Sequence, residues 1–322
     1  MAVFTSISDA DAQGFLKMYD LGVFKSLTGI AAGIENTNYF LETTQGSFVL
    51  TIFEVLKANE LPFYIELMHH LAINGSPVPQ PQTQRSGQRL AQIHNKPAAI
   101  VSKLSGAWVP HPTTQHCRLA AHTLAHCHLV GLNTPIKQSN LRGTAWRQAT
   151  APEVIPFLDD AQKALIHMAL KEDLTLCQSD IWKNLPSGPA HCDLFRDNVL
   201  FESSGSSLTM GGFIDFYFAG VEAWLFDIAV AVNDWCINRN TGALKPELVN
   251  AWVNAYAEVR PFTNDEKNLW TATLRIAALR FWISRLYDFH MPRAAETLKP
   301  HDPTHFERIL SCRFEFEPPL LS

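Results

Sequence analysis

The segment that decides the fold lies at residues 190–218 and reads AHCDLFRDNVLFESSGSSLTMGGFIDFYF. Two short apolar runs in it, Asn198–Phe201 and Leu208–Ile214, flank a turn rich in Ser and Gly, a pattern typical of a β-hairpin. The sequence around this segment mostly has the periodicity of helices, so an isolated hairpin needs an explanation. The hairpin would bring Asp215, which follows it, back to the side of Asn198, which begins it.

Three polar residues placed by this hairpin are Asp193, Asn198 and Asp215. The spacing of the first two, and the Ile-Asp-Phe run around the third, match the catalytic-loop and metal-binding motifs of kinases. Phosphoryl transfer needs one carboxylate to orient the attacking hydroxyl, and an amide and a second carboxylate to hold Mg²⁺. The pattern therefore predicts phosphoryl transfer. The alternative, that both aspartates only cap loops, does not explain why a hairpin returns one of them to this place.

The first third of the chain differs from the rest and predicts a small lobe of mixed α and β structure. Its helices are expected at about 9–20 and 61–74, and its strands at 23–30, 37–43, 48–53, 89–94 and 98–104. Beyond it the pattern is mostly helical, with helices expected at 119–130, 156–176, 246–257 and 263–289. The expected boundary separates an N-terminal lobe, residues 1–104, from a C-terminal lobe, residues 105–322.

The composition argues against several classes of protein. Of the 322 residues, 47% are hydrophobic and 18% are charged, which argues against a disordered chain. The net charge of −5 argues against a general nucleic-acid binder, which needs a basic face. No apolar run reaches the roughly 20 residues of a membrane span, and the first residues show no secretory signal. The six cysteines form no CxxC pair, so we expect reduced thiols and a cytoplasmic location.

Several segments carry a resemblance to a known family. They are GIAAGIENTNYFLET (29–43), FVLTIFE (48–54), LPFYIELMHHLA (61–72), GSPVPQP (75–81), HCDLFRDNVLF (191–201), GFIDFYFAG (212–220), FDIAVAVNDWC (226–236) and LRFWISRLYD (279–288). In these segments the chain resembles the aminoglycoside phosphotransferase and choline kinase family of the protein-kinase-like fold, and within it the bacterial homoserine kinases. The resemblance implies an α+β bilobal fold. A small N-terminal antiparallel-sheet lobe would bind the nucleotide, and a larger, mainly helical C-terminal lobe would carry catalysis and substrate binding.

The same resemblance implies roles for the residues around the hairpin. Asp193 would be the catalytic base, and Asn198 and Asp215 would bind Mg²⁺. His191 and Asp227 would have structural roles near the site, Asp227 by bracing the catalytic loop. The implied activity is ATP-dependent phosphorylation of the hydroxyl of L-homoserine to O-phospho-L-homoserine in threonine biosynthesis, by a monomer or homodimer without nucleic-acid or membrane partners.

The nucleotide side of the implied site includes one departure from the general kinase pattern. The strand at 48–53 carries Thr51 where kinases have a lysine that grips the phosphates, although threonine is usual in the homoserine kinase pattern. The phosphate grip therefore stays open between Lys57 and Lys103, and Glu66 on the following helix is expected to be solvated. The residues expected at the nucleotide are Gly29, Gly33 and Asn38 of the phosphate-covering loop, Thr51, and the backbone of Ser102 and Leu104 at the adenine.

A site for homoserine needs a cationic group for the carboxylate and an anionic or aromatic group for the ammonium. The expected contacts are Asp234 and Trp235 at the ammonium, Arg280 or Arg196 at the carboxylate, and Tyr217 nearby. Each has an alternative, purely structural interpretation. The alternative functions are a kinase for choline, an aminoglycoside or methylthioribose, and a catalytically weak nucleotide-binding module, for which Thr51 is the only support.

Overall fold

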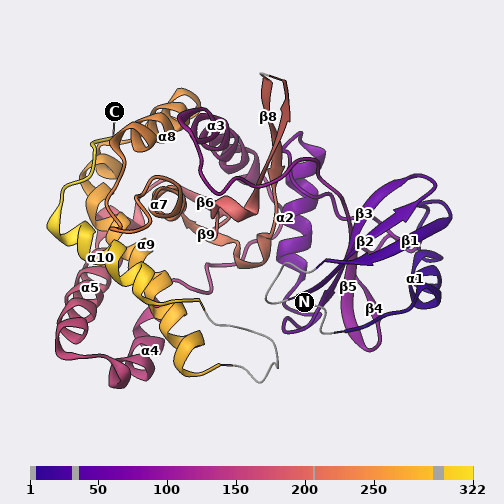
Figure 1. The fold of residues 1–322 in the computed structure, drawn as a ribbon, viewed down its shortest axis with the longest axis horizontal. Helices are drawn as coiled ribbons and strands as arrows, with labels where there is room; N and C mark the ends of the chain where they lie inside the picture. Colours follow the sequence, from indigo (N-terminus) through magenta and orange to yellow (C-terminus); the bar gives the residue numbers. More distant parts are fainter. Residues whose placement is uncertain (1–4, 31–35, 206, 293–300, 322) are drawn as a thin grey trace. The chain divides into compact units, whose positions relative to one another are not determined.

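The computed structural model describes residues 5–30, 36–205, 207–292 and 301–321. The chain forms two compact units, and the boundary between them lies after Ser105 (Figure 1). Among the described residues, no helix is long and apolar enough to cross a membrane. Each of the cysteines has a free thiol.

The N-terminal unit is built on one antiparallel sheet with the strand order β1-β2-β3-β5-β4 (Figure 1). Its elements are α1 (Asp9–Leu16), β1 (Phe24–Gly29), β2 (Asn36–Thr43), β3 (Gly46–Phe53), α2 (Pro62–Ile73), β4 (Ala91–Ile93) and β5 (Lys96–Ser102). One face of the sheet packs against α1, where Phe15 and Leu16 join Leu41, Leu50 and Ile100 in a common core. Alternation along the strands leaves Asn38, Phe40 and Thr51 on the opposite face.

The C-terminal unit is mainly helical. Its helices are α3 (Thr114–Gly131), α4 (Thr144–Val154), α5 (Asp160–Gln178), α6 (Asp180–Lys183), α7 (Trp224–Trp235), α8 (Pro246–Val259), α9 (Asn264–His290) and α10 (Thr304–Glu315), with short 3₁₀ turns at Ile155–Phe157, Arg196–Asn198 and Phe216–Phe218. α9 contacts α4, α5, α7 and α10, and α3 packs along α8. The expected α+β class, with an antiparallel-sheet lobe followed by a helical one, is confirmed.

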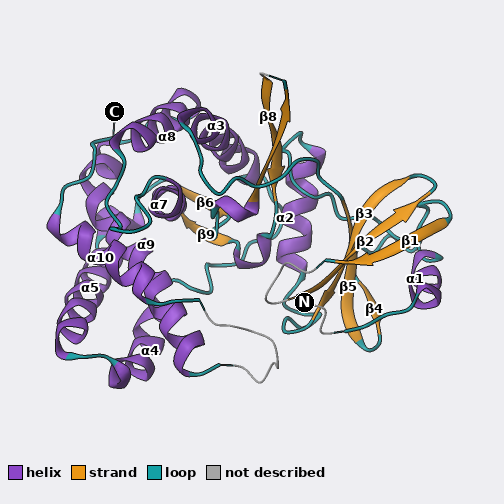
Figure 2. Ribbon diagram, viewed as in Figure 1, coloured by secondary structure: helices purple, strands orange, loops and turns teal. Residues whose placement is uncertain are grey.

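The predicted hairpin is present in this helical unit (Figure 2). β7 (Val199–Ser204) pairs antiparallel with β8 (Ser207–Phe213), and a second ribbon joins β6 (Ser187–Ala190) to β9 (Gly220–Ala223). Gly106 allows the chain to approach this hairpin: its φ is +94°, and a Cβ there would lie 2.4 Å from the carbonyl oxygen of Phe201. The next residue, Ala107, exchanges two backbone hydrogen bonds with Phe201, each 2.9 Å long.

The sequence patterns missed several elements for identifiable reasons. Nearly every residue of α7 is buried, so its sequence is an almost unbroken apolar run, which periodicity alone does not distinguish from a buried strand. β6 is a four-residue strand of Ser, Gly, Pro and Ala, which are poor strand formers. The first helix ends at Leu16 rather than near residue 20, because Tyr19 forms a β-bridge with Gln84.

Candidate active site

The loop that carries Asp193 is fixed by Asp227 of α7. One carboxylate oxygen of Asp227 accepts the backbone N–H of His191 at 2.8 Å, and the other accepts the N–H of Cys192 at 2.7 Å. Cys192 has a φ of +60°, a left-handed conformation that costs a non-glycine residue roughly 1–2 kcal/mol. Asp227 is fully buried, so these two hydrogen bonds set the backbone that leads into Asp193.

A chain of buried polar groups supports Asp227 from behind. Nε2 of His128 lies 2.9 Å from Asp227, and Nδ1 of His128 lies 2.7 Å from the hydroxyl of Tyr256. That hydroxyl accepts a hydrogen bond from Nε of Arg260, which also pairs with Glu266. Because Arg260 can only donate, the chain is satisfied when Tyr256 donates to Nδ1 and Nε2–H donates to Asp227. Although burial alone would raise it, the pKa of Asp227 is held below its ordinary value by His128 and His191.

The hairpin brings Asp215 back beside Asn198, as its spacing predicted. The N–H of Ile214 donates to the carbonyl of Asn198 at 2.9 Å, and Nε2 of His191 donates to the carbonyl of Ile214 at 2.9 Å. Asp215 itself has φ +63° and ψ +63°, a left-handed backbone conformation like that of Cys192. Non-glycine residues in this region are uncommon and concentrate at functional sites.

Asn198 and Asp215 offer oxygen ligands suited to a hard cation. Nδ2 of Asn198 donates to the backbone carbonyl of Asp193 at 2.9 Å, which fixes the amide and turns its oxygen away from that carbonyl. The Asp215 side chain is exposed. One amide and one carboxylate oxygen fit Mg²⁺, which keeps several waters and is bound by few protein ligands together with substrate phosphates.

The Asp193 carboxyl lies in an environment that disfavours its charge. Burial raises its pKa to about 8, and the negative charge of Asp215 acts in the same direction. The positive charges of Arg280 and Arg285, both on α9, oppose this shift. A carboxyl whose pKa is moved by burial and by specific charged neighbours is typical of a functional site.

Two residues of the N-terminal unit that were expected to contact the nucleotide, Thr51 and Asn38, are hydrogen-bonded to each other. Thr51 faces Asn38 across β2 and β3, and its hydroxyl donates to Oδ1 of Asn38 at 2.8 Å. Gly29 ends β1 and pairs with Tyr39, while Gly33 lies outside the described residues.

Two charged residues of this unit, Lys103 and Glu66, bear on which cation could bind the phosphates. Nζ of Lys103 lies 4.4 Å from the ring centroid of Phe40, on the face that carries Asn38 and Thr51. Glu66 is not simply solvated, as the sequence suggested, because its carboxylate pairs with Arg89 at 2.7 Å. Glu66 of α2 therefore does form an ion pair, but its partner is Arg89, which precedes β4, and not a residue of β3.

Ser102 and Leu104, which were expected to contact the adenine through their backbone, differ in how free that backbone is. The N–H of Ser102 donates to the carbonyl of Gln80 at 2.9 Å, and its hydroxyl accepts from the N–H of Gln80 at 2.8 Å. The Ser102 N–H is therefore already used inside the protein. Leu104 is half-buried and follows the end of β5.

Two of the expected substrate contacts instead bind each other. Nε of Arg196 lies 2.9 Å from the Asp234 carboxylate, and the guanidinium also donates to the carbonyl of Pro110 at 3.0 Å. The pair is almost completely buried, and the same carboxylate accepts the backbone N–H of Arg196 at 2.8 Å. A neutralised ion pair of this kind positions the loop, so neither partner is left to clamp a substrate.

Trp235 belongs to the core and does not face a substrate, which corrects the expectation from sequence. It is 1% exposed, its indole N–H donates to the carbonyl of Leu194 at 3.0 Å, and its ring packs against Trp252. Tyr217 is half-buried in the 3₁₀ turn that follows Asp215. Trp235 therefore supports the catalytic loop from the inside.

Arg280, expected at the substrate carboxylate, lies on α9, and its charge acts on Asp193. It is 3% exposed, and its guanidinium lies 5.3 Å from the ring centroid of Phe218, in the turn after Asp215. Sequence reasoning missed Arg285 and Asp197, whose charges also act on Asp193. Asp197 adjoins Asn198 in the motif, and Arg285 follows Arg280 on one helix, so spacing alone could have indicated both.

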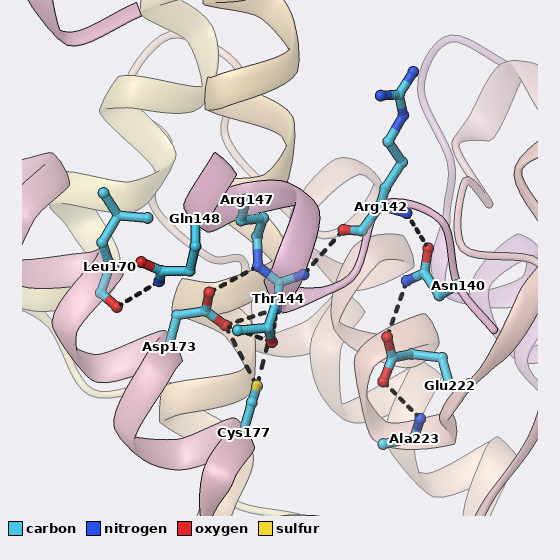
Figure 3. A network of polar contacts seen from close by, with 10 residues as sticks. All are labelled: Asn140, Arg142, Thr144, Arg147, Gln148, Leu170, Asp173, Cys177, Glu222 and Ala223. Atoms are coloured by element: carbon cyan, nitrogen blue, oxygen red, sulfur yellow. Dashed lines mark hydrogen bonds and ion pairs between the residues drawn. The ribbon is translucent and has the colours of Figure 1, made fainter. Parts of the chain in front are cut away.

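A second polar network connects residues 140–142, which run alongside β9, to α4 and α5 (Figure 3). Arg147 of α4 binds the Asp173 carboxylate of α5 with bonds of 3.0 and 2.6 Å, and it also donates to the carbonyl of Arg142 at 3.1 Å. Asn140 donates to Glu222 of β9 at 2.9 Å. The Arg142 guanidinium points away from this network (Figure 3). Its carbon lies 4.5 Å from the ring centroid of Trp146.

The chain is similar to known proteins over most of its length. Residues 26–262 match the model of the phosphotransferase enzyme family. The homoserine kinase of Burkholderia cenocepacia (strain HI2424) is 51% identical, covering 99% of this chain and 98% of its own. That of Burkholderia thailandensis is 52% identical, covering 97% and 96%.

Among solved structures, the amicoumacin kinase hAmiN, in complex with AMP-PNP, Ca²⁺ and Ami, aligns with a TM-score of 0.69. The alignment covers 96% of this chain and 93% of that one at 13% identity, so this likeness concerns the fold. The expected aminoglycoside-phosphotransferase-like kinase fold is thereby confirmed. The chain therefore belongs to the phosphotransferase enzyme family, alongside the bacterial homoserine kinases that it resembles over nearly its whole length.

Proposed function

We propose that this protein is an ATP-dependent kinase that phosphorylates the side-chain hydroxyl of L-homoserine to O-phospho-L-homoserine, on the path to threonine. The observation that carries the proposal is the arrangement around the β7–β8 hairpin. Asn198 and Asp215 flank this hairpin, the Asn198 amide binds the carbonyl of Asp193, and Asp227 of α7 binds the backbone that leads into Asp193. Relatives at 51–52% identity over nearly the whole chain are homoserine kinases, which supports the choice of substrate.

In this mechanism, Asp193 binds the homoserine hydroxyl, orients it for in-line attack on the γ-phosphate and accepts its proton. Its raised pKa, about 8, suits a group that must take up a proton near neutral pH. Asn198 and Asp215 would hold Mg²⁺, which neutralises charge that develops on the phosphates. His191 and Asp227 position the loop and do not react.

The N-terminal lobe, residues 1–104, takes the nucleotide role in this proposal, and residues 105–322 take the catalytic and substrate roles. Gly29 and Gly33 are proposed to contact the phosphates, as are Asn38 and Thr51, which share one face of the sheet. The backbone of Leu104 and the carbonyl of Ser102 are the groups proposed for adenine. Lys103 is the cation on that same sheet face, beside Phe40, so it is the first candidate for the missing phosphate grip.

The test is turnover of Mg·ATP by the purified protein, read as ADP release. L-homoserine is compared with L-serine, choline, kanamycin and methylthioribose. Release with homoserine, well above all the others, is the expected result. Release with another compound alone would keep the phosphotransferase mechanism and overturn the substrate. Nucleotide binding without release with any of the compounds would favour the binding-module alternative.

A further inference from the structure

We propose that Arg280 and Arg285 of α9, together with Asp197, form an α-amino-acid subsite beside Asp193. The two guanidinium groups bind the substrate carboxylate, and Asp197 binds the ammonium. This inference rests on the proposed function, because it concerns the acceptor whose hydroxyl Asp193 activates. It also names recognition residues that differ from most of those expected from the sequence.

Arg280 is a buried cation whose hydrogen-bonding capacity is not used inside the protein. It is 3% exposed and stacks on Phe281 and Phe218, with 3.8 and 5.3 Å between the guanidinium carbon and the ring centroids. Within the described part of the chain, no group accepts a hydrogen bond from it. A guanidinium carries five N–H donors in a fixed fork, so those of Arg280 stay available to a ligand. A bound carboxylate would satisfy two of them at once.

Arg285 supplies a second cation from the same helix. It is half-buried, and burial lowers its pKa. Arg285 lies one helical turn after Phe281, whose ring packs 4.5 Å from that of Phe195 in the loop that follows Asp193, and its charge acts on Asp193 and Asp197. Among the residues that the structure describes, it forms no ion pair. The positive charges of Arg280 and Arg285 repel each other, so an anionic ligand between them would relieve the cost of burying both.

Asp197 is the matching anionic group. Asp197 is exposed and lies two residues after Phe195, whose ring packs 4.5 Å from that of Phe281 on α9. Its charge acts on both Asp193 and Arg285. Of the other acids whose charges act on Arg285, Asp234 is already bound by Arg196 with three contacts of 2.8–3.0 Å, and Asp288 lies on α9 itself. Asp197 is therefore the acid of the Asp193 loop that is left to face an ammonium.

The size of an amino-alcohol acid fits this arrangement. Only three carbon atoms separate the hydroxyl oxygen of homoserine from its carboxylate carbon. A group that binds the carboxylate must therefore lie close to the group that binds the hydroxyl. Phe281, which follows Arg280 on α9, packs 4.5 Å from Phe195 in the loop of Asp193, and the charges of Arg280 and Arg285 both act on Asp193. Recognition of both ends of the zwitterion would also explain discrimination against neutral alcohols and polycationic sugars, which lack the carboxylate.

The experiment removes each charge from the protein and from the substrate in turn. Arg285→Gln and Arg280→Lys are assayed with L-homoserine and with 3-aminopropan-1-ol, which lacks the carboxylate. Each variant is expected to raise the KM for homoserine by about 10- to 100-fold and to leave the KM for the amino alcohol and for ATP nearly unchanged. Asp197→Asn is expected to raise the KM for homoserine but not for 4-hydroxybutyrate, which lacks the ammonium.

Arg275→Gln is the matched control, because Arg275 lies on the same helix and is already paired with Glu172 at 2.9 Å. Equal losses with homoserine and the amino alcohol would show a purely structural role and overturn the subsite. A rise in the KM for ATP instead would move the arginines to the phosphates and overturn it equally.

A binding measurement separates this inference from the proposed function. L-2-aminobutyrate has the carboxylate and ammonium of homoserine but no hydroxyl, so it can bind without reacting. Calorimetric titration in the presence of AMP-PNP is expected to show binding to the unmodified protein and a loss of about tenfold or more in Arg285→Gln. If this binding and its loss are observed but homoserine is not turned over, the proposed function is contradicted and the subsite is not. Turnover of homoserine that is insensitive to both arginines would sink the subsite alone.

Discussion

The Asp227 carboxylate holds Cys192 in a left-handed backbone conformation, through a hydrogen bond of 2.7 Å to its N–H. The residue after Cys192 is Asp193, so this hydrogen bond helps to position the base that we propose for the reaction. The same carboxylate binds the N–H of His191 and is itself bound by His128. One buried acid thus connects the backbone of the catalytic loop to the helical core behind it.

The left-handed conformation gives a prediction about stability. Cys192→Gly and Cys192→Ala both remove the buried thiol, but only glycine adopts a positive φ without a steric cost. The glycine variant is therefore expected to exceed the alanine variant by about 1 kcal/mol in the free energy of unfolding, as measured by urea denaturation. Equal stabilities would mean that the conformation of Cys192 stores no strain.

The role of Asp193 is tested by removing its charge with little change in shape. Asp193→Asn is expected to lower kcat by about 10²- to 10⁴-fold or more, because the amide cannot accept the hydroxyl proton. Binding of Mg·AMP-PNP, measured by calorimetry, should persist. Asp180→Asn, at an exposed aspartate of α6, is the control and should retain full activity. Near-normal turnover by the Asp193 variant would remove it from the mechanism.

The buried imidazole of His128 predicts a loss of stability in acid. Burial lowers its pKa below the ordinary 6.5, so the unfolded chain takes up a proton that the folded protein does not. The stabilisation is complete above about pH 6.5 and is lost as the pH falls toward the folded pKa, by up to about 1.4 kcal/mol per pH unit. His128→Gln should flatten this slope between pH 7 and pH 5, leaving the contribution of His191, which burial shifts in the same direction. His167→Gln, at an exposed position, should leave the slope unchanged; a slope unaltered in the His128 variant would contradict the account.

The Arg147–Asp173 pair predicts a large cost when only one partner is removed. Both side chains are essentially inaccessible to water, at 1% and 0% exposure. Asp173→Asn leaves an uncompensated buried cation and is expected to destabilise the protein by about 3–5 kcal/mol in urea denaturation. The double variant Arg147→Met, Asp173→Leu should recover much of this loss, because no charge stays buried. Equal destabilisation of the single and double variants would show that packing, and not charge, explains the effect.

The sequence predicted those residues of the site that lie close together along the chain or are joined by a single hairpin. Asp193 and Asn198 lie on one loop, and Asp215 returns through a single hairpin, so spacing alone brings the three together. The strands of the N-terminal sheet were predictable for the same reason, since their apolar alternation and short turns are local signals.

The errors concern contacts between residues distant along the chain. Arg196 and Asp234 are 38 residues apart, and nothing in either segment indicates that they bind each other. Trp235 lies at the end of a helix that is buried on all sides, so its periodicity could not show whether it faces the core or a ligand. The orientation of such residues is decided by tertiary packing.

The most direct test of the central claim is to identify the phosphorylated product. Phosphorus NMR of a reaction containing Mg·ATP and L-homoserine is expected to show ADP and one new phosphate ester in equal amounts. Asp193→Asn should abolish the ester, and L-2-aminobutyrate, which lacks the hydroxyl, should give none. Consumption of ATP that yields only inorganic phosphate, with no ester of homoserine, would contradict the account.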